Sequence, residues 1–260
     1  MLRDRLLATR YAAEHGFRWR GREVSRLEGL SDAVFAFALT LLVVSLEVPR
    51  SAREVLGVMR GFGAFAVTAF LMFRLWVMQY VFYRRYGLED GATRNLNAAL
   101  LLFVLFYAFP LKFLATTISD YALAGGPGRF RPGALNAALR QPDVRALVFV
   151  YFFGSAAVFA ILGLLYLHAW RHRRTLELDA YEERVTRGAW ERLLVGALAQ
   201  VVLPFAFVTA ADGRETAALA LDAAALGLAA FMIRRTRQAR RIRQAMERAG
   251  PAAEAISRPV

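Results

Sequence analysis

Six long apolar stretches constrain this chain more than any other feature of its sequence. They run over residues 30–48, 56–83, 96–118, 146–170, 193–211 and 216–233. A helix that crosses the hydrocarbon layer of a membrane needs about 20 mostly apolar residues. An open strand would leave backbone groups unsatisfied in lipid, so each stretch is expected to be a helix. With 57% hydrophobic residues and a mean hydropathy of +0.36, the chain is predicted to be an all-α, polytopic membrane protein with six transmembrane helices per subunit.

Basic residues are distributed unevenly between the two sets of loops that these stretches define. Of 34 Lys and Arg residues, 24 lie in the amino-terminal segment, the second and fourth loops and the tail, while eight lie in the other three loops or, in the case of Arg60, just inside the second stretch. The positive-inside rule then places both termini in the cytoplasm. We expect a cytoplasmic segment over 1–29, a membrane domain over 30–233 and a basic cytoplasmic tail over 234–260. The location predicted is the bacterial inner membrane.

Several classes of function are disfavoured by the residues that are present. The chain has no cysteine and only three histidines. His168 and His172 are four residues apart but lack the adjacent carboxylate of a metalloprotease motif, so we assign them to a membrane–water boundary. No nucleophile and base are paired, and the arginines follow membrane topology rather than a nucleic-acid motif. The sequence predicts no enzyme, no cofactor, no metal ligand set and no nucleic-acid partner.

Charged and polar residues mark the entrance to the first apolar stretch. Ser31 and Asp32 precede twelve mostly apolar residues, and either can cap a helix. A charged Asp at the mouth of a membrane helix otherwise needs a partner. Arg26 and the intramembrane Arg74 are candidates for that partner, although Arg74 can equally extend to the interface.

One face of the first stretch is continuous at helical spacing. At about 100° per residue, Ala33, Phe37, Thr40 and Val44 fall within about 60° of one another, and Leu41 flanks them. The stripe is apolar apart from one hydroxyl. Ordinary helix packing, with Thr40 bonded to the carbonyl four residues back, would explain it.

A resemblance to a known family gives this stripe another interpretation. The string Arg26-x-x-x-Leu30-Ser31-Asp32, followed by the apolar helix with Thr40, resembles the R-x-x-x-F-S-D signature of the endolysosomal potassium channel family (transmembrane protein 175), particularly its prokaryotic single-repeat members. Trp76 in the second stretch is similar to the family tryptophan. Asn95-Leu96-x-x-x-Leu100 leading to Phe109-Pro110 is similar to a further pattern in the third stretch.

The resemblance implies a potassium-permeable, leak-type channel formed by a homotetramer in the lipid bilayer. Four copies of the first helix would line the pore. The constriction and gate would be formed by the residues Phe37, Thr40, Leu41 and Val44. Glu47, at the outer end, would concentrate cations or simply lie exposed at the interface.

The chain departs from the family pattern at three places. Leu30 replaces the signature phenylalanine, and Phe37 stands where relatives carry isoleucine or leucine at the constriction. Gln79 and Tyr80 stand where many members carry histidines after the tryptophan. Any polar network between the first two helices, to which Arg74, Trp76 and Gln79 would belong, is therefore expected to differ here.

Two other kinds of membrane protein are compatible with the residues alone. A secondary transporter would use the intramembrane residues Lys112, Gln200, Pro204 and Asp222. A structural pairing of Asp222 with a neighbouring helix is the simpler interpretation of that residue. A non-conducting scaffold would instead act through the basic helix predicted over 234–250.

Overall fold

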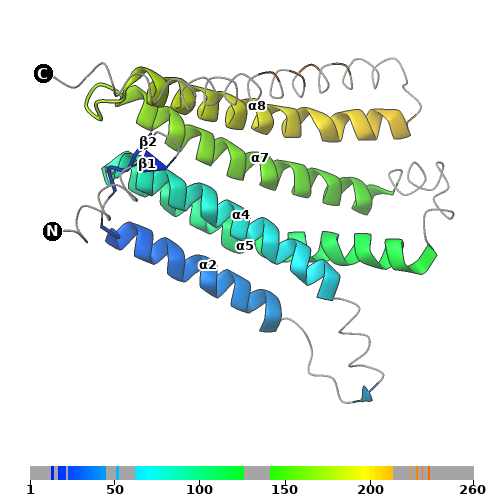
Figure 1. The fold of residues 1–260 in the computed structure, drawn as a ribbon. Helices are drawn as coiled ribbons and strands as arrows, with labels where there is room; N and C mark the ends of the chain where they lie inside the picture. Colours follow the sequence, from blue (N-terminus) through cyan, green and yellow to red (C-terminus); the bar gives the residue numbers. More distant parts are fainter. Residues whose placement is uncertain are drawn as a thin grey trace, which may run out of the picture.

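The computed structural model describes residues 13–14, 17–21, 23–44, 51–52, 62–125, 141–212 and the single positions 223, 227, 230 and 234. Within these residues the chain forms one short hairpin and five long helices (Figure 1). The strands are β1 (Ala13–Glu14) and β2 (Phe17–Arg18), which pair antiparallel. The helices are α2 (Arg26–Val44), α4 (Phe62–Tyr86), α5 (Gly91–Gly125), α7 (Pro142–Arg171) and α8 (Ala180–Ala211).

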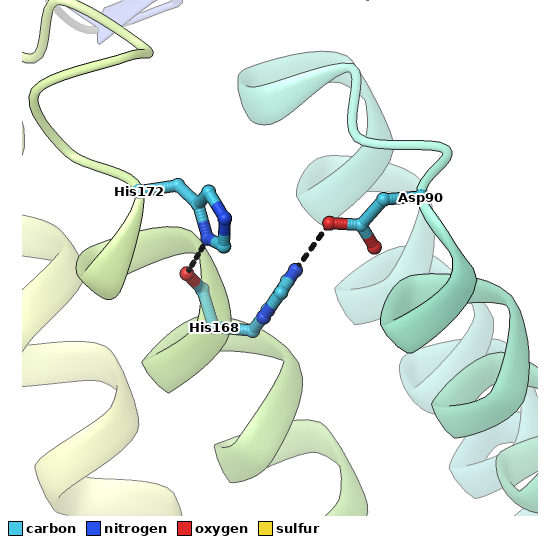
Figure 2. A group of neighbouring side chains, drawn as sticks. All are labelled: Asp90, His168 and His172. Carbon is cyan, nitrogen blue, oxygen red and sulfur yellow. Dashed lines mark hydrogen bonds and ion pairs between the residues drawn. The ribbon is translucent and has the colours of Figure 1, made fainter.

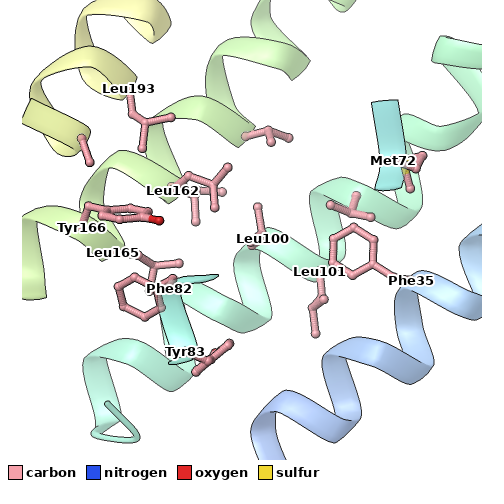
Figure 3. Close-up of a cluster of buried hydrophobic side chains, with 14 of the residues drawn as sticks. Phe35, Met72, Phe82, Tyr83, Leu100, Leu101, Leu162, Leu165, Tyr166 and Leu193 are labelled. Carbon is pink, nitrogen blue, oxygen red and sulfur yellow. The ribbon is translucent and has the colours of Figure 1, made fainter. Parts of the chain in front are cut away.

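The helices form a bundle in which α2 occupies one edge (Figure 1). α2 packs against α4 and α5, α5 also packs against α7, and α7 pairs extensively with α8. Buried apolar side chains from α2, α4, α5, α7 and α8 join in one core (Figure 3). Phe35, Met72, Leu100, Leu162 and Leu193 represent the five helices in that core. Among the described residues, no helix packs against the other side of α2.

A sharp turn places α4 and α5 side by side in opposite directions. Gly87 has φ of 59°, and its N–H donates to the Tyr83 carbonyl at 2.9 Å. A left-handed residue after the last turn is a common helix ending, and glycine adopts it without steric cost. Only three residues then separate Gly87 from the first residue of α5. The turn brings the end of α4 and the start of α5 to the same end of the bundle.

The hairpin ties the amino-terminal end of α2 to the ends of α4 and α8. Phe17 is buried and packs edge-on against Tyr86, with ring centroids 5.6 Å apart. Arg20 reaches Glu182 of α8 at 2.5 Å, and the carboxylate of Glu182 is fully buried. Gly21 lies so close to α4 that an added Cβ would stand 2.4 Å from the Tyr83 carbonyl oxygen. The hairpin and the residues just after it therefore hold the helices together at one end of the bundle.

The predicted all-α class agrees with the structure, but the predicted count of six transmembrane helices is wrong for the residues that the structure describes. Four helices are long and apolar enough to cross a membrane: Phe65–Tyr86, Gly91–Phe113, Pro142–Arg171 and Ala180–Thr209. α2 is not among them, because Arg26, Glu28 and Asp32 occupy its first seven positions. Of the sixth predicted span, 216–233, only single positions are described, and a two-stranded hairpin precedes the bundle.

Candidate functional site

The helix α2 has one face packed into the bundle and one face turned outward. Its buried positions recur every three or four residues, at Ser31, Phe35, Ala38 and Leu42, each 3% exposed or less. This spacing follows from 3.6 residues per helical turn, which brings such positions to one side. Within the part of the chain that the structure describes, no helix covers the opposite side. The function therefore depends on what surrounds the side of α2 that is turned outward.

The outward face contains several of the residues predicted for a pore. Phe37 is 58% exposed and Leu30 is 56% exposed. Thr40 is also exposed, and its hydroxyl donates to the Ala36 carbonyl at 2.9 Å. Leu41 lies half-buried at the margin of this face. The pore-lining role of these residues stays a prediction.

Two residues of the predicted pore stripe cannot be placed in the same detail. Val44 ends α2, but its side chain lies outside the described part of the structure, and Glu47 falls wholly outside it. The face is defined from Leu30 to Val43, which is 49% exposed. We call this surface, comprising Leu30, Ala33, Ala36, Phe37, Thr40 and Val43, the outward face of α2.

Asp32 is held by an indole rather than by an arginine. Trp76 Nε1 of α4 donates to Asp32 Oδ1 at 2.7 Å. Among the described residues no ion pair joins Asp32 to Arg26 or to Arg74, and both arginines are exposed. A neutral donor satisfies one carboxylate oxygen but leaves the negative charge uncompensated. Asp32 therefore presents a charge close to the outward face of α2.

A buried polar network joins α2, α4 and α5 one residue before Asp32. Ser31 Oγ donates to the Leu27 carbonyl at 2.8 Å. The same oxygen accepts from Gln79 Nε2 at 3.1 Å and from Asn97 Nδ2 at 3.0 Å. Gln79 Nε2 also donates to Asn97 Oδ1, which closes the triangle. All three side chains are 1% exposed or less, so each relies on the other two in place of water.

Asn97 was not expected from the sequence. The resemblance pointed to Asn95, which the structure places on the exposed side of α5. The available signal was a second asparagine, two positions later, inside an apolar stretch. A polar residue there usually faces protein rather than lipid. Two positions along a helix correspond to about 200° of rotation, so Asn95 and Asn97 must face nearly opposite directions.

A third contact fixes the entrance of α2. Glu28 is 4% exposed and forms an ion pair with Arg84 of α4, Oε1 to NH2, at 2.9 Å. The Glu28 N–H donates to Ser25 Oγ at 3.1 Å, which is half of a capping box. The Arg84 guanidinium also lies 5.3 Å from the centroid of Tyr80, and Tyr80 stacks on Trp76. Arg84, Tyr80 and Trp76 of α4 therefore contact one another in a row beside the first two turns of α2.

The far end of α2 is held by a lysine from α5. Lys112 Nζ donates to the Leu42 carbonyl at 2.9 Å. A cation near the carboxyl-terminal end of a helix interacts favourably with the helix dipole. The lysine that the transporter hypothesis required therefore supports α2. Of the other residues in that hypothesis, Pro204 is buried within α8, Gln200 is half-buried and Asp222 lies outside the described residues.

These contacts make α2 a braced helix rather than a loosely attached one. Four attachments from α4 and α5 fix both its position and its rotation. The outward face is consequently presented in one orientation, and it combines apolar side chains, one hydroxyl and a nearby carboxylate. Such a surface suits a narrow aqueous passage in an assembly of several chains.

Comparisons with known proteins agree with this arrangement. Residues 26–107, which cover α2, α4 and about the first half of α5, match the family described as Endosomal/lysosomal potassium channel TMEM175. A potassium channel from Marivirga tractuosa is 35% identical over 168 residues, which cover 64% of this chain and 67% of that protein. A potassium channel from Chamaesiphon minutus is 25% identical over 163 residues, which cover 60% of this chain and 68% of that protein.

A solved structure extends the similarity to the fold. The crystal structure of a variant of the potassium channel MtTMEM175, in complex with a Nanobody-MBP fusion protein, superposes with a TM-score of 0.70 at 27% sequence identity. The match covers 88% of this chain and 99% of that chain. Together with four membrane-compatible helices, these similarities identify a multi-pass membrane protein. The chain belongs to the TMEM175 potassium channel family, a family of ion channels rather than of enzymes.

Proposed function

We propose that this protein is a potassium-permeable, leak-type channel in which four copies of the chain surround a central passage lined by the outward face of α2. The observation that carries the proposal is the position of Asp32. It is exposed, its Trp76 partner is neutral, and it lies beside the apolar stripe that contains Phe37 and Thr40. A carboxylate facing lipid is costly, whereas one at the mouth of a water-filled passage is solvated and attracts cations.

The outward face supplies the parts that a passage of this kind requires. Four symmetry-related Phe37 rings would form an apolar constriction that can close by dewetting. The Thr40 hydroxyl hydrogen already points to the Ala36 carbonyl. Its oxygen lone pairs are therefore free to act as partial ligands for a dehydrating cation. Leu41 and Val44 would continue the apolar lining of the passage beyond Thr40.

Rigid support of α2 favours selectivity. A passage can distinguish potassium from sodium only if its width and its ligands stay fixed while an ion passes. The Ser31–Gln79–Asn97 network, the Glu28–Arg84 pair and the Lys112 contact all hold the backbone of α2. Selection would then arise in the passage itself, and the residues Arg26, Leu30, Ser31 and Asp32 would serve its entrance.

The direction of insertion follows from charge. The 24 basic residues of the amino-terminal segment, the second and fourth loops and the tail favour a cytoplasmic position for both termini in a bacterial inner membrane. On this assignment the hairpin, the entrance of α2 and Asp32 face the cytoplasm. Residues 234–260 would form a cytoplasmic tail.

Ion flux from liposomes tests the proposal. Purified protein should release potassium faster than sodium, and Phe37→Ala should raise the potassium rate because it removes the constriction. Phe106→Ala is the matched control, since Phe106 is also a phenylalanine, is 70% exposed and belongs to α5. An equal effect of both substitutions would reject α2 as the lining, and no flux from any variant would reject the channel.

A further inference from the structure

Three metal-ligating side chains meet at the end of the bundle where α4 turns into α5, which is also the end at which α2 begins. Asp90 lies just before α5, His168 is in the last turn of α7, and His172 follows that helix (Figure 2). His168 Nε2 lies 2.6 Å from Asp90 Oδ2. The two imidazole centroids are 4.4 Å apart. One ligand atom from each residue falls within 4.8 Å of the other two.

Asp90 is held in place by an interaction that leaves one oxygen available. Its Oδ1 accepts from the Thr93 N–H at 2.8 Å, as a cap of α5. Its Oδ2 is then directed at His168. The cap therefore fixes the orientation of the carboxylate and leaves Oδ2 available to a metal ion.

His172 is oriented for ligation by the backbone. Its Nδ1 lies 3.0 Å from the His168 carbonyl, to which only a protonated Nδ1 can donate. A neutral ring protonated at Nδ1 carries its lone pair on Nε2. A backbone carbonyl that fixes the second nitrogen in this way is the usual support for a metal-bound histidine. The structure thus selects the tautomer that leaves Nε2 open.

The surroundings admit a cation. The His168 side chain is 16% exposed and that of Asp90 is 39% exposed, so an ion can enter from water. Arg173 follows His172 in the chain but is directed elsewhere. Its Nε lies 2.9 Å from Glu183 Oε1, and its guanidinium lies 4.4 Å from the Trp170 ring centroid.

We propose that Asp90, His168 and His172 bind a divalent transition-metal ion of the Zn²⁺ type, with water completing the coordination. Two imidazoles and one carboxylate suit such ions better than Mg²⁺ or Ca²⁺, which prefer oxygen ligands. Metal–ligand bonds of about 2.0–2.2 Å place tetrahedral ligand atoms roughly 3.4 Å apart. The ligand atoms are 2.6 Å apart at the Asp90–His168 pair and within 4.8 Å of one another overall, so side-chain rotations would bring them to that spacing. Metal binding at His168 Nε2 would replace the hydrogen bond to Asp90, and the proton of the neutral ring would then be carried on Nδ1.

The cluster joins two distant segments of the chain, since Asp90 and His168 are 78 residues apart in the sequence. A bound ion would connect the start of α5 to the end of α7. Because binding occurs only where the folded chain brings the ligands together, metal should raise the thermal transition of the protein, with the logarithm of the metal concentration once it exceeds the dissociation constant.

The composition of the chain makes the test unusually direct. It contains three histidines and no cysteine, so His15 is the only other imidazole or thiol ligand. The full chain, free of any polyhistidine tag, is titrated in detergent with Co²⁺, whose absorption reports coordination, and with Zn²⁺ against a chromophoric chelator. We expect one ion per chain in the wild type and in the control variant His15→Ala.

Substitution of the ligands should weaken binding at least about tenfold, because even supporting partners of metal ligands contribute that much. His172→Ala leaves the Asp90–His168 contact in place, and Asp90→Asn keeps a capping side chain, so both should elute as the wild type does from size exclusion. Equal binding by a His168→Ala/His172→Ala double variant, loss of binding in His15→Ala, or no binding by the wild type would each overturn the proposal.

Discussion

A single hydrogen bond determines how the Asp32 carboxylate is held at the amino-terminal end of α2. Arginine was the expected partner of Asp32, since an ion pair is the common solution near a membrane. The structure instead supplies the Trp76 indole, which fixes the carboxylate without neutralising it. A hydrogen bond to a charged group contributes about 1.5–3 kcal/mol when formed, and partial exposure favours the lower end. Asp32 is thus positioned and still able to attract cations.

Replacement of Trp76 by phenylalanine tests this role. The aromatic packing on Tyr80 survives, while the donor to Asp32 is lost. We expect the free energy of unfolding to fall by about 1–2 kcal/mol, with little further loss when Asp32→Ala is added. Thermal unfolding in detergent measures both effects.

Phe73→Leu is the control for that experiment, because Phe73 contacts Trp76 with ring centroids 5.3 Å apart. Full additivity of Trp76→Phe and Asp32→Ala would show that the two residues do not act through one bond.

At the scale of the elements, polar contacts set the rotation of α2 against α4 and α5. Apolar packing alone tolerates small rotations, since one methyl contact can replace another. The Ser31, Gln79 and Asn97 side chains have fixed donors and acceptors and no access to water. A rotation that separated them would leave buried groups unsatisfied, at about 1–3 kcal/mol each. The network therefore specifies which face of α2 is turned outward.

Asn97→Leu should consequently lower the free energy of unfolding by about 1–3 kcal/mol, because Ser31 and Gln79 lose a partner that water cannot replace. Gln79→Leu should behave similarly, and the double variant should lose less than the sum of the two. Thermal unfolding and potassium flux together measure the change.

Asn95→Leu is the matched control, because the same substitution falls on the exposed side of the same helix. If it destabilises the protein as much as Asn97→Leu does, the network has no special role.

For the whole molecule, one surface has no partner among the described residues of a single chain. The outward face of α2 is braced from behind by α4 and α5, while the hairpin region holds the helix ends that charge predicts to be cytoplasmic. A central assembly of four chains would bring four copies of this face together. Lipid would otherwise have to cover Asp32 and Thr40 beside apolar side chains.

Cysteine cross-linking tests that assembly in a chain that has no native cysteine. Ala33→Cys, on the outward face of α2, should form disulfide-linked dimers on mild oxidation in the membrane, since neighbouring copies of this helix would approach closely. A disulfide requires Cα atoms within about 7 Å, so the signal reports direct proximity.

Ala98→Cys is the comparison, because Ala98 is an exposed alanine on α5. Denaturing electrophoresis without reductant separates the products. Equal cross-linking at both positions, or none at Ala33, would contradict an assembly around α2.

The apolar stretches predicted the helices well wherever lipid or core packing dictates composition. The stretches 56–83, 96–118, 146–170 and 193–211 correspond to α4, α5, α7 and α8. The largest difference in boundary lies at α8, which begins at Ala180 rather than near 193. Its first turns are rich in charge and were interpreted as a loop. They are helical because Glu182 is buried against the hairpin, a partner more than 160 residues away.

The sequence by itself determined the membrane class, most helix positions, the apolar stripe on α2 and the family resemblance, because these depend on local composition and helical periodicity. Only the tertiary structure decided the number of candidate spans and the partners of Asp32, Ser31, Lys112 and His168. Those partners lie 44 to 78 residues away. Pairing at such distances depends on how each helix is rotated and offset against its neighbours, and one residue of offset turns a side chain by about 100°.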